Sequence, residues 1–378
     1  MTGIKLLKDT KNYMNNYKVL HIIDSLGLGG AQTILKGIFE AQTENNAIFI
    51  YSLRKKDITI SILHPNVFIY DSFKKYSFGS LYQLKKMVEI EKIDILHCHL
   101  FKSQVFGLLL KTIWFRNIKL EFHEHGEIIE NSTLYRWMLR FTQNKVSSFI
   151  AVSKAMKDFL IKKAKIKEGK ITVLYNFVDV NKFNRENINW DIDEEKNKLN
   201  IKKDEFVVGF SGRLITRKGW KEFIEAASEI LEKQNKIKFL IVGDGPDRLK
   251  MLKLIESYKL KDKIYYLGYT SDMLLFYSLI DCFVLPSYWE GLAMTQLEVL
   301  AMGIPLISSD GIGMNEIGID NESCLYTRIG DKSDISEKIL RVFSDIGLKE
   351  KLINNSKNTI KQYTLPTFLE GLNDIYKM

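Results

Sequence analysis

DCFVLPSYWEGLAMTQLEVLAMGIPLISSD, residues 281–310, contains a complete strand–helix–strand pattern. The apolar runs at 281–287 and 304–310 predict two buried strands. The segment between them predicts a helix that ends near Gly303, a residue type common just past a helix end. Two buried strands joined by a helix indicate a parallel sheet with helices on its faces. Between the two predicted strands, Glu290 and Glu298 are the two carboxylates in an otherwise largely apolar stretch.

The same alternation extends over most of the chain and indicates a second sheet of the same α/β kind. Further buried strands are predicted at 18–24, 47–53, 67–71, 93–100, 118–125, 147–153, 171–176, 206–214, 236–245 and 263–269, with helical patterns at 31–42, 80–91 and 103–114. The alternation lapses over the polar stretch 177–205. Two similar wound halves imply a cleft between them.

These patterns predict four parts. We expect an N-terminal Rossmann-like domain over 1–180, a linker over 181–200 and a C-terminal Rossmann-like domain over 201–355. The last part, 356–378, reads as a C-terminal helical segment that packs back toward the N-terminal domain, and Pro366 is expected to interrupt the helical pattern.

The composition is that of an ordinary globular protein, with 46% hydrophobic and 27% charged residues in 378. Three widely spaced cysteines indicate neither a disulfide framework nor a zinc knuckle. The first residues lack the apolar core of a secretory signal, and the sequence predicts no membrane-spanning helix. We therefore expect a cytoplasmic protein, soluble or peripheral to the membrane.

The positive charge is concentrated in the first half of the chain. Residues 1–180 carry 27 Lys and Arg against 16 Asp and Glu, whereas the remainder carries 28 against 30. One interpretation is that the first domain meets an anionic partner, either the inner face of a membrane or a phosphate-bearing acceptor. The other is a Lys-rich solvated surface, and the sequence leaves both open.

Loops that follow buried strands are the candidate binding segments, because open parallel sheets bind ligands at the carboxyl ends of their strands. The first such loop contains Gly27, Gly29 and Gly30 before a helix, and another contains Gly243 and Gly245. Glycine lets the backbone approach a phosphate closely, and a helix N-terminus offers N–H groups to it. Tight turns are the alternative. A nicotinamide fingerprint would need GxGxxG, which the first loop lacks.

Charged side chains near two further strand ends suit a diphosphate and a sugar. Arg213 and Lys218 follow one strand within SGRLITRKGW, and an exposed basic loop is the alternative interpretation. Glu290 precedes a helix whose N–H groups are free to bind an anion. Glu298 lies about six residues into that helix, or about 9 Å along its axis at 1.5 Å per residue. Its neighbours are apolar, so a solvated surface position is disfavoured.

PSYWEGLAMTQLEVLAMGIP resembles the EX7E segment of the retaining GT-B glycosyltransferases of family four. DSLGLGGAQ, DILHCHL, HEHG, VLYNFVD, GRLITRKG and VGDGP follow the family's order over roughly residues 18–330. The resemblance implies the GT-B fold, two Rossmann-like domains that face a central cleft. Two departures are Gln32, where the family often has Glu, and Phe177 in NFVD, where NG is commoner.

The resemblance also implies roles for individual residues. Glu290 would hold donor-sugar hydroxyls near C3, Glu298 the ribose, and His125 the C6 hydroxyl of the sugar. Arg213 and Lys218 would neutralise the departing diphosphate, and the remaining donor contacts would come from Gly29, Gly30, Gly243, Gly245, Gly291, Leu292, Ala293 and Met294. Such enzymes react on one face of the sugar without a protein nucleophile and need no metal or other cofactor.

His97, His99, His123 and His125 are numerous enough to suggest a metal site. Their alternation along strands favours packing or hydrogen bonding instead, since each pair lies on one face of a buried strand end. Of these four, only His125 has an expected role in the reaction.

We therefore expect a retaining hexosyltransferase that uses a UDP- or GDP-type nucleotide-sugar donor. The expected acceptor is a glycan, lipid-linked or part of a surface polysaccharide, with no nucleic-acid partner. A sugar-nucleotide epimerase and a catalytically silent partner subunit that binds nucleotide or glycan are the alternatives; a nicotinamide-dependent oxidoreductase is less favoured.

Overall fold

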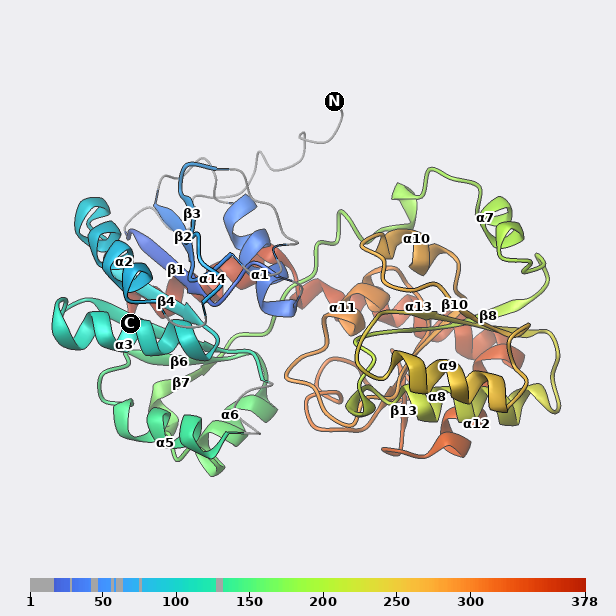
Figure 1. Cartoon of the computed structure of the whole chain (residues 1–378). Helices are drawn as coiled ribbons and strands as arrows, with labels where there is room; N and C mark the ends of the chain where they lie inside the picture. Colours follow the sequence, from blue (N-terminus) through green and yellow to red (C-terminus); the bar gives the residue numbers. More distant parts are fainter. Residues whose placement is uncertain are drawn as a thin grey trace. The chain divides into compact units, whose positions relative to one another are not determined.

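The computed structural model describes residues 17–27, 29–41, 47–55, 58, 64–74, 77–126 and 132–378. The chain divides into two compact units (Figure 1). Unit 1 comprises the chain up to Phe177 together with Leu365–Met378, and unit 2 comprises Val178–Thr364. Each contains a parallel sheet with helices, so the prediction of two parallel-sheet α/β domains is confirmed.

Unit 1 has a seven-stranded sheet in the order β3-β2-β1-β4-β5-β6-β7. Its strands are β1 (Val19–Ile23), β2 (Ile48–Ser52), β3 (Val67–Ile69), β4 (Ile95–His99), β5 (Lys119–Glu124), β6 (Ser148–Ala151) and β7 (Ile171–Val173). Its helices are α1 (Gly30–Glu40), α2 (Phe78–Glu91), α3 (Phe101–Ile113), α5 (Thr133–Thr142), α6 (Lys154–Lys162) and α14 (Leu365–Lys377), with a 3-10 turn η1 (Glu168–Lys170). The register places His21 beside His97 and His99 beside His123.

Unit 2 has a six-stranded sheet in the order β10-β9-β8-β11-β12-β13. Its strands are β8 (Phe206–Ser211), β9 (Ile237–Val242), β10 (Ile264–Tyr266), β11 (Cys282–Leu285), β12 (Leu306–Ser309) and β13 (Leu325–Thr327). Its helices are α7 (Ile192–Lys198), α8 (Trp220–Leu231), α9 (Arg248–Ser257), α10 (Met273–Ser278), α11 (Met294–Ala301), α12 (Lys332–Ser344) and α13 (Ile346–Thr359). Short 3-10 turns are η2 (Arg185–Asn187), η3 (Thr216–Lys218) and η4 (Ile360–Gln362).

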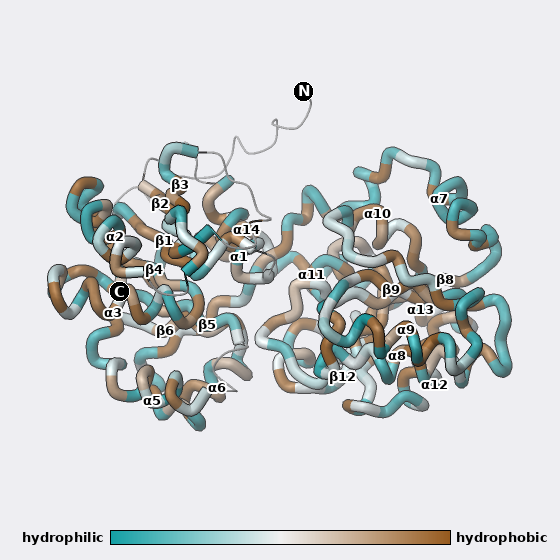
Figure 2. The backbone as a smooth tube through the Cα atoms, viewed as in Figure 1, coloured by the Kyte–Doolittle hydropathy of each residue, from teal (hydrophilic) through white to brown (hydrophobic). Residues whose placement is uncertain are grey.

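Burial of apolar side chains on these strands holds each sheet to its helices. In unit 2 the cluster includes Phe210, Phe223 and Phe239, all fully buried, with neighbouring rings in contact. Figure 2 shows hydrophobic residues along β1 and β9 and mostly hydrophilic residues around α7. None of the helices in the described part of the chain is long and apolar enough to cross a membrane.

The unit boundaries differ from the predicted ones at two places. The predicted linker, 181–200, belongs to unit 2, where α7 forms and Lys196 lies 3.5 Å from Asp281. At the other end, 356–364 also belongs to unit 2, and the chain returns to unit 1 only from Leu365. There Lys119 Nζ donates to the Tyr376 carbonyl at 2.9 Å, which fixes the end of α14 against β5.

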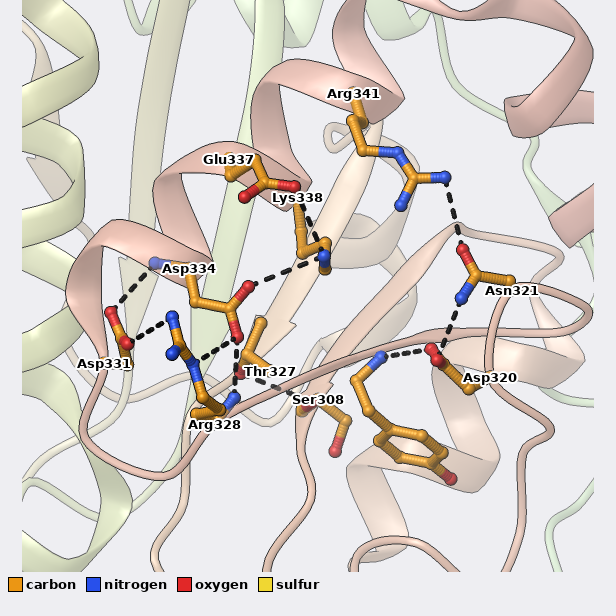
Figure 3. Close-up of polar contacts among 11 residues, drawn as sticks. Ser308, Asp320, Asn321, Thr327, Arg328, Asp331, Asp334, Glu337, Lys338 and Arg341 are labelled. Atoms are coloured by element: carbon orange, nitrogen blue, oxygen red, sulfur yellow. Dashed lines mark hydrogen bonds and ion pairs between the residues drawn. The ribbon is translucent and has the colours of Figure 1, made fainter.

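A polar network closes the start of α12 in unit 2 (Figure 3). Asp331 caps the helix by accepting from the Asp334 backbone N–H at 3.0 Å. Arg328 bridges the two carboxylates, at 2.8 Å from Asp331 and 3.6 Å from Asp334. Acidic groups are favourable in the first turn of a helix because they face its free N–H groups. The network therefore stabilises the turn between β13 and α12.

Candidate functional site

The candidate site of unit 2 lies where the loops after β8 and β11 meet, because the strand order reverses between these neighbours. Such a reversal opens a crevice beyond the carboxyl ends of the strands. The loops are joined directly, since the Tyr288 N–H donates to the Arg217 carbonyl at 2.8 Å. Gly219 has a φ of 71°, and a Cβ there would lie 2.1 Å from the Pro286 oxygen. The close approach of the loops therefore requires glycine at 219.

The two loops bring Lys218 and Glu290 together. The ammonium Nζ lies 2.5 Å from the carboxylate Oε1, and the side chains are 19% and 9% exposed. Each charge compensates the other, which is the condition for keeping an ion pair in a nearly buried position. The pair therefore places a cation and a hydrogen-bond acceptor side by side where the strand order reverses between β8 and β11.

Two arginines lie in the same loop, in different environments. Arg213 is exposed, and its side chain has no hydrogen-bond or ion-pair partner among the described residues. Arg217, by contrast, packs its guanidinium on the Trp289 ring, 5.0 Å from the centroid. Arg213 is thus the cation of this loop with a side chain available to an anionic ligand.

The turn that contains Gly243 and Gly245 is pressed against the β8 loop. A Cβ at Gly243, where φ is 138°, would lie 1.9 Å from the Gly212 oxygen, and one at Gly245 would lie 2.5 Å from the Leu214 oxygen. The Leu214 N–H also donates to the Asp244 carbonyl at 2.9 Å. Packing of loop on loop therefore explains both glycines, while their contact with a nucleotide stays a prediction.

The start of α11 follows Glu290 directly, as the sequence predicts. Its N-cap, Ala293, has no side-chain acceptor, so the first-turn N–H groups can bind an anion. The predicted residues Gly291, Leu292, Ala293 and Met294 lie at this helix end. Gly313, with a φ of 77°, packs so closely that a Cβ would lie 2.1 Å from the Glu290 oxygen. The loop after β12 therefore fixes the backbone that carries Glu290.

Two tyrosines that sequence reasoning missed hold carboxylates in unit 2. Tyr277 donates to Glu298 at 2.7 Å, and burial raises the pKa of Glu298 to about 7. Tyr288 donates to Glu222 at 2.7 Å, which raises the tyrosine pKa to about 12. Each pair joins residues far apart in sequence, so spacing gave no signal of it. The hydrogen bond from Tyr277 thereby orients the Glu298 carboxyl group.

In unit 1 the glycine loop after β1 leads into α1. Gly29 precedes the helix and provides no side-chain cap, and contact of the N–H groups near Gly30 with the donor stays a prediction. Gln32 is nearly buried and donates from Nε2 to the Ser25 carbonyl at 3.2 Å. It therefore closes the loop internally. Leu28 lies outside the described residues.

Five histidines gather at the carboxyl ends of β1, β4 and β5. His21 Nδ1 lies 3.0 Å from His99 Nε2, and His99 Nδ1 lies 3.1 Å from His125 Nε2. His97 Nε2 lies 3.2 Å from His123 Nδ1. Hydrogen bonding therefore connects these rings, and one chain of three ends at His125, the residue predicted to contact the sugar.

The histidine rings stack rather than converge. Ring nitrogens of two triples, His21–His97–His99 and His99–His123–His125, lie within 4.8 Å of one another, as metal ligands would. The His97 and His99 planes, however, differ by only 5°, with centroids 4.4 Å apart. A metal must lie in the plane of each imidazole that binds it, so the parallel His97 and His99 rings do not suit a shared ion. In the second triple the ring planes differ by 27–39°. Stacking and hydrogen bonds connect these rings, and the absence of a metal from the cluster stays a prediction.

Burial keeps these imidazoles neutral. It lowers the pKa of His21 and His125 to about 3, and that of His97, His99 and His123 well below the ordinary value. The same strand region contains Glu121 and Glu124, whose pKa values burial raises to about 7. Glu124 accepts from Gln104 at 2.8 Å and from Tyr135 at 3.0 Å. The strand ends of unit 1 thus hold desolvated groups of low charge.

Two protein-family models match successive parts of the chain. Residues 38–182 match Glycosyltransferase Family 4, and residues 191–359 match Glycosyl transferases group 1. A capsular polysaccharide biosynthesis glycosyltransferase from Staphylococcus aureus, CapM, is 26% identical over 79% of this chain and 81% of its own. The UDP-Gal:alpha-D-GlcNAc-diphosphoundecaprenol alpha-1,3-galactosyltransferase of Escherichia coli is 28% identical over 79% of this chain and 78% of its own.

Solved structures of similar fold cover nearly the whole chain. Anabaena HepE, in a complex with UDP and glucose, has a TM-score of 0.84 at 18% identity and covers 96% of this chain and 100% of its own. The sucrose-phosphate synthase of Thermosynechococcus elongatus has a TM-score of 0.79 at 18% identity, with 95% and 98% covered. At this identity the likeness concerns the fold.

Proposed function

Because the chain belongs to the glycosyltransferases and has their GT-B fold, we propose that it transfers a sugar from a nucleoside diphosphate donor bound at unit 2. The observation that carries the proposal is the Lys218–Glu290 pair, fixed at the strand-order reversal directly before the uncapped start of α11. A cation, a carboxylate and free N–H groups are what a diphosphate and a sugar require together.

In the proposed reaction the diphosphate leaves while the acceptor attacks from the same face of the sugar, so the configuration is retained. Lys218 and Arg213 stabilise the negative charge that develops on the leaving group, together with the N–H groups at the start of α11. Glu290 binds sugar hydroxyls and Glu298 the ribose. Because side chains supply the positive charge, the step at unit 2 uses no metal.

We assign UDP as the carrier and a lipid-linked or surface polysaccharide as the acceptor. The HepE complex with UDP and the UDP-Gal donor of the Escherichia coli relative support the first assignment. The diphosphoundecaprenol acceptor of that relative and the capsular role of CapM support the second. Such an acceptor implies work at the cytoplasmic face of the cell membrane, for which the basic first half of the chain is suited.

The base and the reaction are tested in two steps. A thermal-shift series with UDP, GDP and ADP selects the carrier, because a ligand that binds only the folded state raises the melting temperature. Transfer from the matching nucleotide sugar is then followed by NMR of the anomeric carbon in the product. We expect stabilisation by UDP and retained configuration. Inversion, donor turnover to a changed sugar without acceptor, or binding without any turnover would overturn the proposal.

A further inference from the structure

Helix α5 exposes an apolar ridge. Leu134, Trp137 and Phe141 are 77%, 54% and 67% exposed. Their spacing places them on one side of the helix, since residues three, four and seven apart share a face. Tyr135 and Leu139 on the other side are fully or almost fully buried and hold the helix to the sheet. Large side chains in a row on the solvent side are unusual for a soluble monomer and mark an interaction surface.

Helix α3 extends this ridge. The strands β4, β5 and β6 are neighbours in sequence order, so the crossover helices α3 and α5 lie on the same face of the sheet (Figure 1). They are tied at both ends: Phe101 packs edge-on against Tyr135, and Lys145 donates to Thr112 at 3.0 Å. The second half of α3 exposes Leu109, Ile113 and Trp114.

We define the α3–α5 face by its exposed apolar residues, which are Leu109, Ile113, Trp114, Leu134, Trp137 and Phe141.

Every charged residue on the two helices is basic. Neither α3 nor α5 contains an Asp or Glu. Arg116, Arg140 and Lys145 are exposed beside the apolar residues, and Arg136 lies on α5 between them. Apolar and aromatic side chains flanked by Arg and Lys suit the boundary between lipid headgroups and acyl chains, where the cations meet anionic headgroups.

We infer that the α3–α5 face docks on an anionic lipid bilayer. Trp137, Phe141 and Leu134 enter the headgroup boundary, and the arginines contact lipid phosphates. The inference rests on the proposed function in that a lipid-linked acceptor lies in the same membrane. It goes further by assigning the contact to two helices of unit 1.

Vesicle flotation tests the inference with the full chain. The wild type is mixed with vesicles of phosphatidylcholine alone or with added phosphatidylglycerol, at low and high salt. We expect binding only to the anionic vesicles and less of it at high salt. Trp137→Ser with Phe141→Ser is expected to lower the bound fraction by roughly tenfold, since buried apolar area sets interfacial affinity. Leu249→Ser with Leu252→Ser, exposed positions on α9, is the matched control and should bind like the wild type.

The charge contribution is tested by Arg136→Gln with Arg140→Gln against Lys233→Gln with Lys253→Gln in unit 2. Loss of anionic binding only in the first pair supports the inference. Equal vesicle binding by the wild type and by Trp137→Ser with Phe141→Ser would overturn the inference. A wild-type dimer that becomes monomeric in this double variant would also overturn it. UDP stabilisation is measured in every variant: it should persist, and its absence from the wild type as well would count against the proposed function rather than against docking.

Discussion

Units 1 and 2 share a parallel-sheet design but differ in what their strand ends hold. Unit 2 places a fixed ion pair there, Lys218 with Glu290, on loops locked backbone to backbone through Gly219 and Gly243. Unit 1 places stacked neutral imidazoles there, packed against aromatic rings of α14. The difference fits the two tasks that the proposed function assigns to the units. Permanent charge on rigid loops suits a diphosphate, and a low-charge edge suits a neutral sugar or glycan.

The largest effect is expected from removing the carboxylate of unit 2. Glu290→Gln keeps the size of the side chain and removes the charge that pairs with Lys218. We expect the transfer rate to fall about a hundredfold or more, because in the proposed reaction this preorganised carboxylate holds the donor sugar. Steady-state kinetics with UDP-sugar measure this.

Glu225→Gln, on α8, is the control, because Glu225 forms an i, i+4 pair with Lys221. Its rate should match that of the wild type. A wild-type transfer rate in Glu290→Gln would contradict the assignment of Glu290 to the donor site.

The rigidity of the unit 2 loops is tested by Gly243→Ala. The new Cβ would meet the Gly212 oxygen at 1.9 Å, and φ is 138°, so we expect the free energy of unfolding to fall by about 3 kcal/mol or more. At Gly268, φ is also positive but nothing lies within 4 Å, so Gly268→Ala should cost about 1–2 kcal/mol. Urea denaturation compares the two variants, and equal losses would show that the loop contact adds nothing.

Acidification is expected to lower the stability of unit 1 but not that of unit 2. In unit 1 the folded histidines have pKa values below the unfolded value, so the unfolded state binds more protons and stability falls as pH drops below about 6.5. Glu121 and Glu124, raised to about 7, act in the opposite direction between about pH 7 and 4.5, but the five histidines outnumber them. In unit 2 burial raises the pKa of Glu298 to about 7, and this shift favours the folded state as pH falls through the same range.

Calorimetry at pH 7 and pH 5, with limited proteolysis to identify the open unit, measures this difference. We expect unit 1 to lose stability on acidification and unit 2 to keep it. Loss from unit 2 first would contradict the assignment of neutral histidines to unit 1.

The smallest effect is expected at Glu298. Its raised pKa shows that burial disfavours the ionised form, so Glu298→Gln should leave the protein as stable as the wild type, or more so, at pH 8. UDP affinity should fall by roughly tenfold, the loss of about one charged hydrogen bond. Titration calorimetry with UDP measures the affinity. An unchanged UDP affinity would contradict the proposed contact between Glu298 and the ribose.

Much of the fold follows from short-range patterns. The runs at 281–287 and 304–310 become β11 and β12, and the helix between them ends at Ala301, before Gly303 with a φ of 62°. The boundary at 181–200 was misplaced because polar α7 contributes little apolar periodicity and is held to unit 2 by Lys196.

The site was predictable in its residues but less so in its contacts. Lys218 and Glu290 each follow a strand, which the sequence shows, but their pairing depends on which strands are neighbours. Tyr277 gave no signal, because its contact with Glu298 crosses two elements. The spacing of Leu134, Trp137 and Phe141 is visible in the sequence, yet only burial shows that they face outward.

Calorimetric titration of UDP into Lys218→Ala tests the central claim most directly, with Lys221→Ala as the matched control one turn along the same segment. We predict that Lys218→Ala weakens UDP binding by about tenfold or more, since a cation at the diphosphate is lost, while Lys221→Ala binds like the wild type. Equal UDP affinity in the two variants would contradict the placement of the donor diphosphate at the Lys218–Glu290 pair.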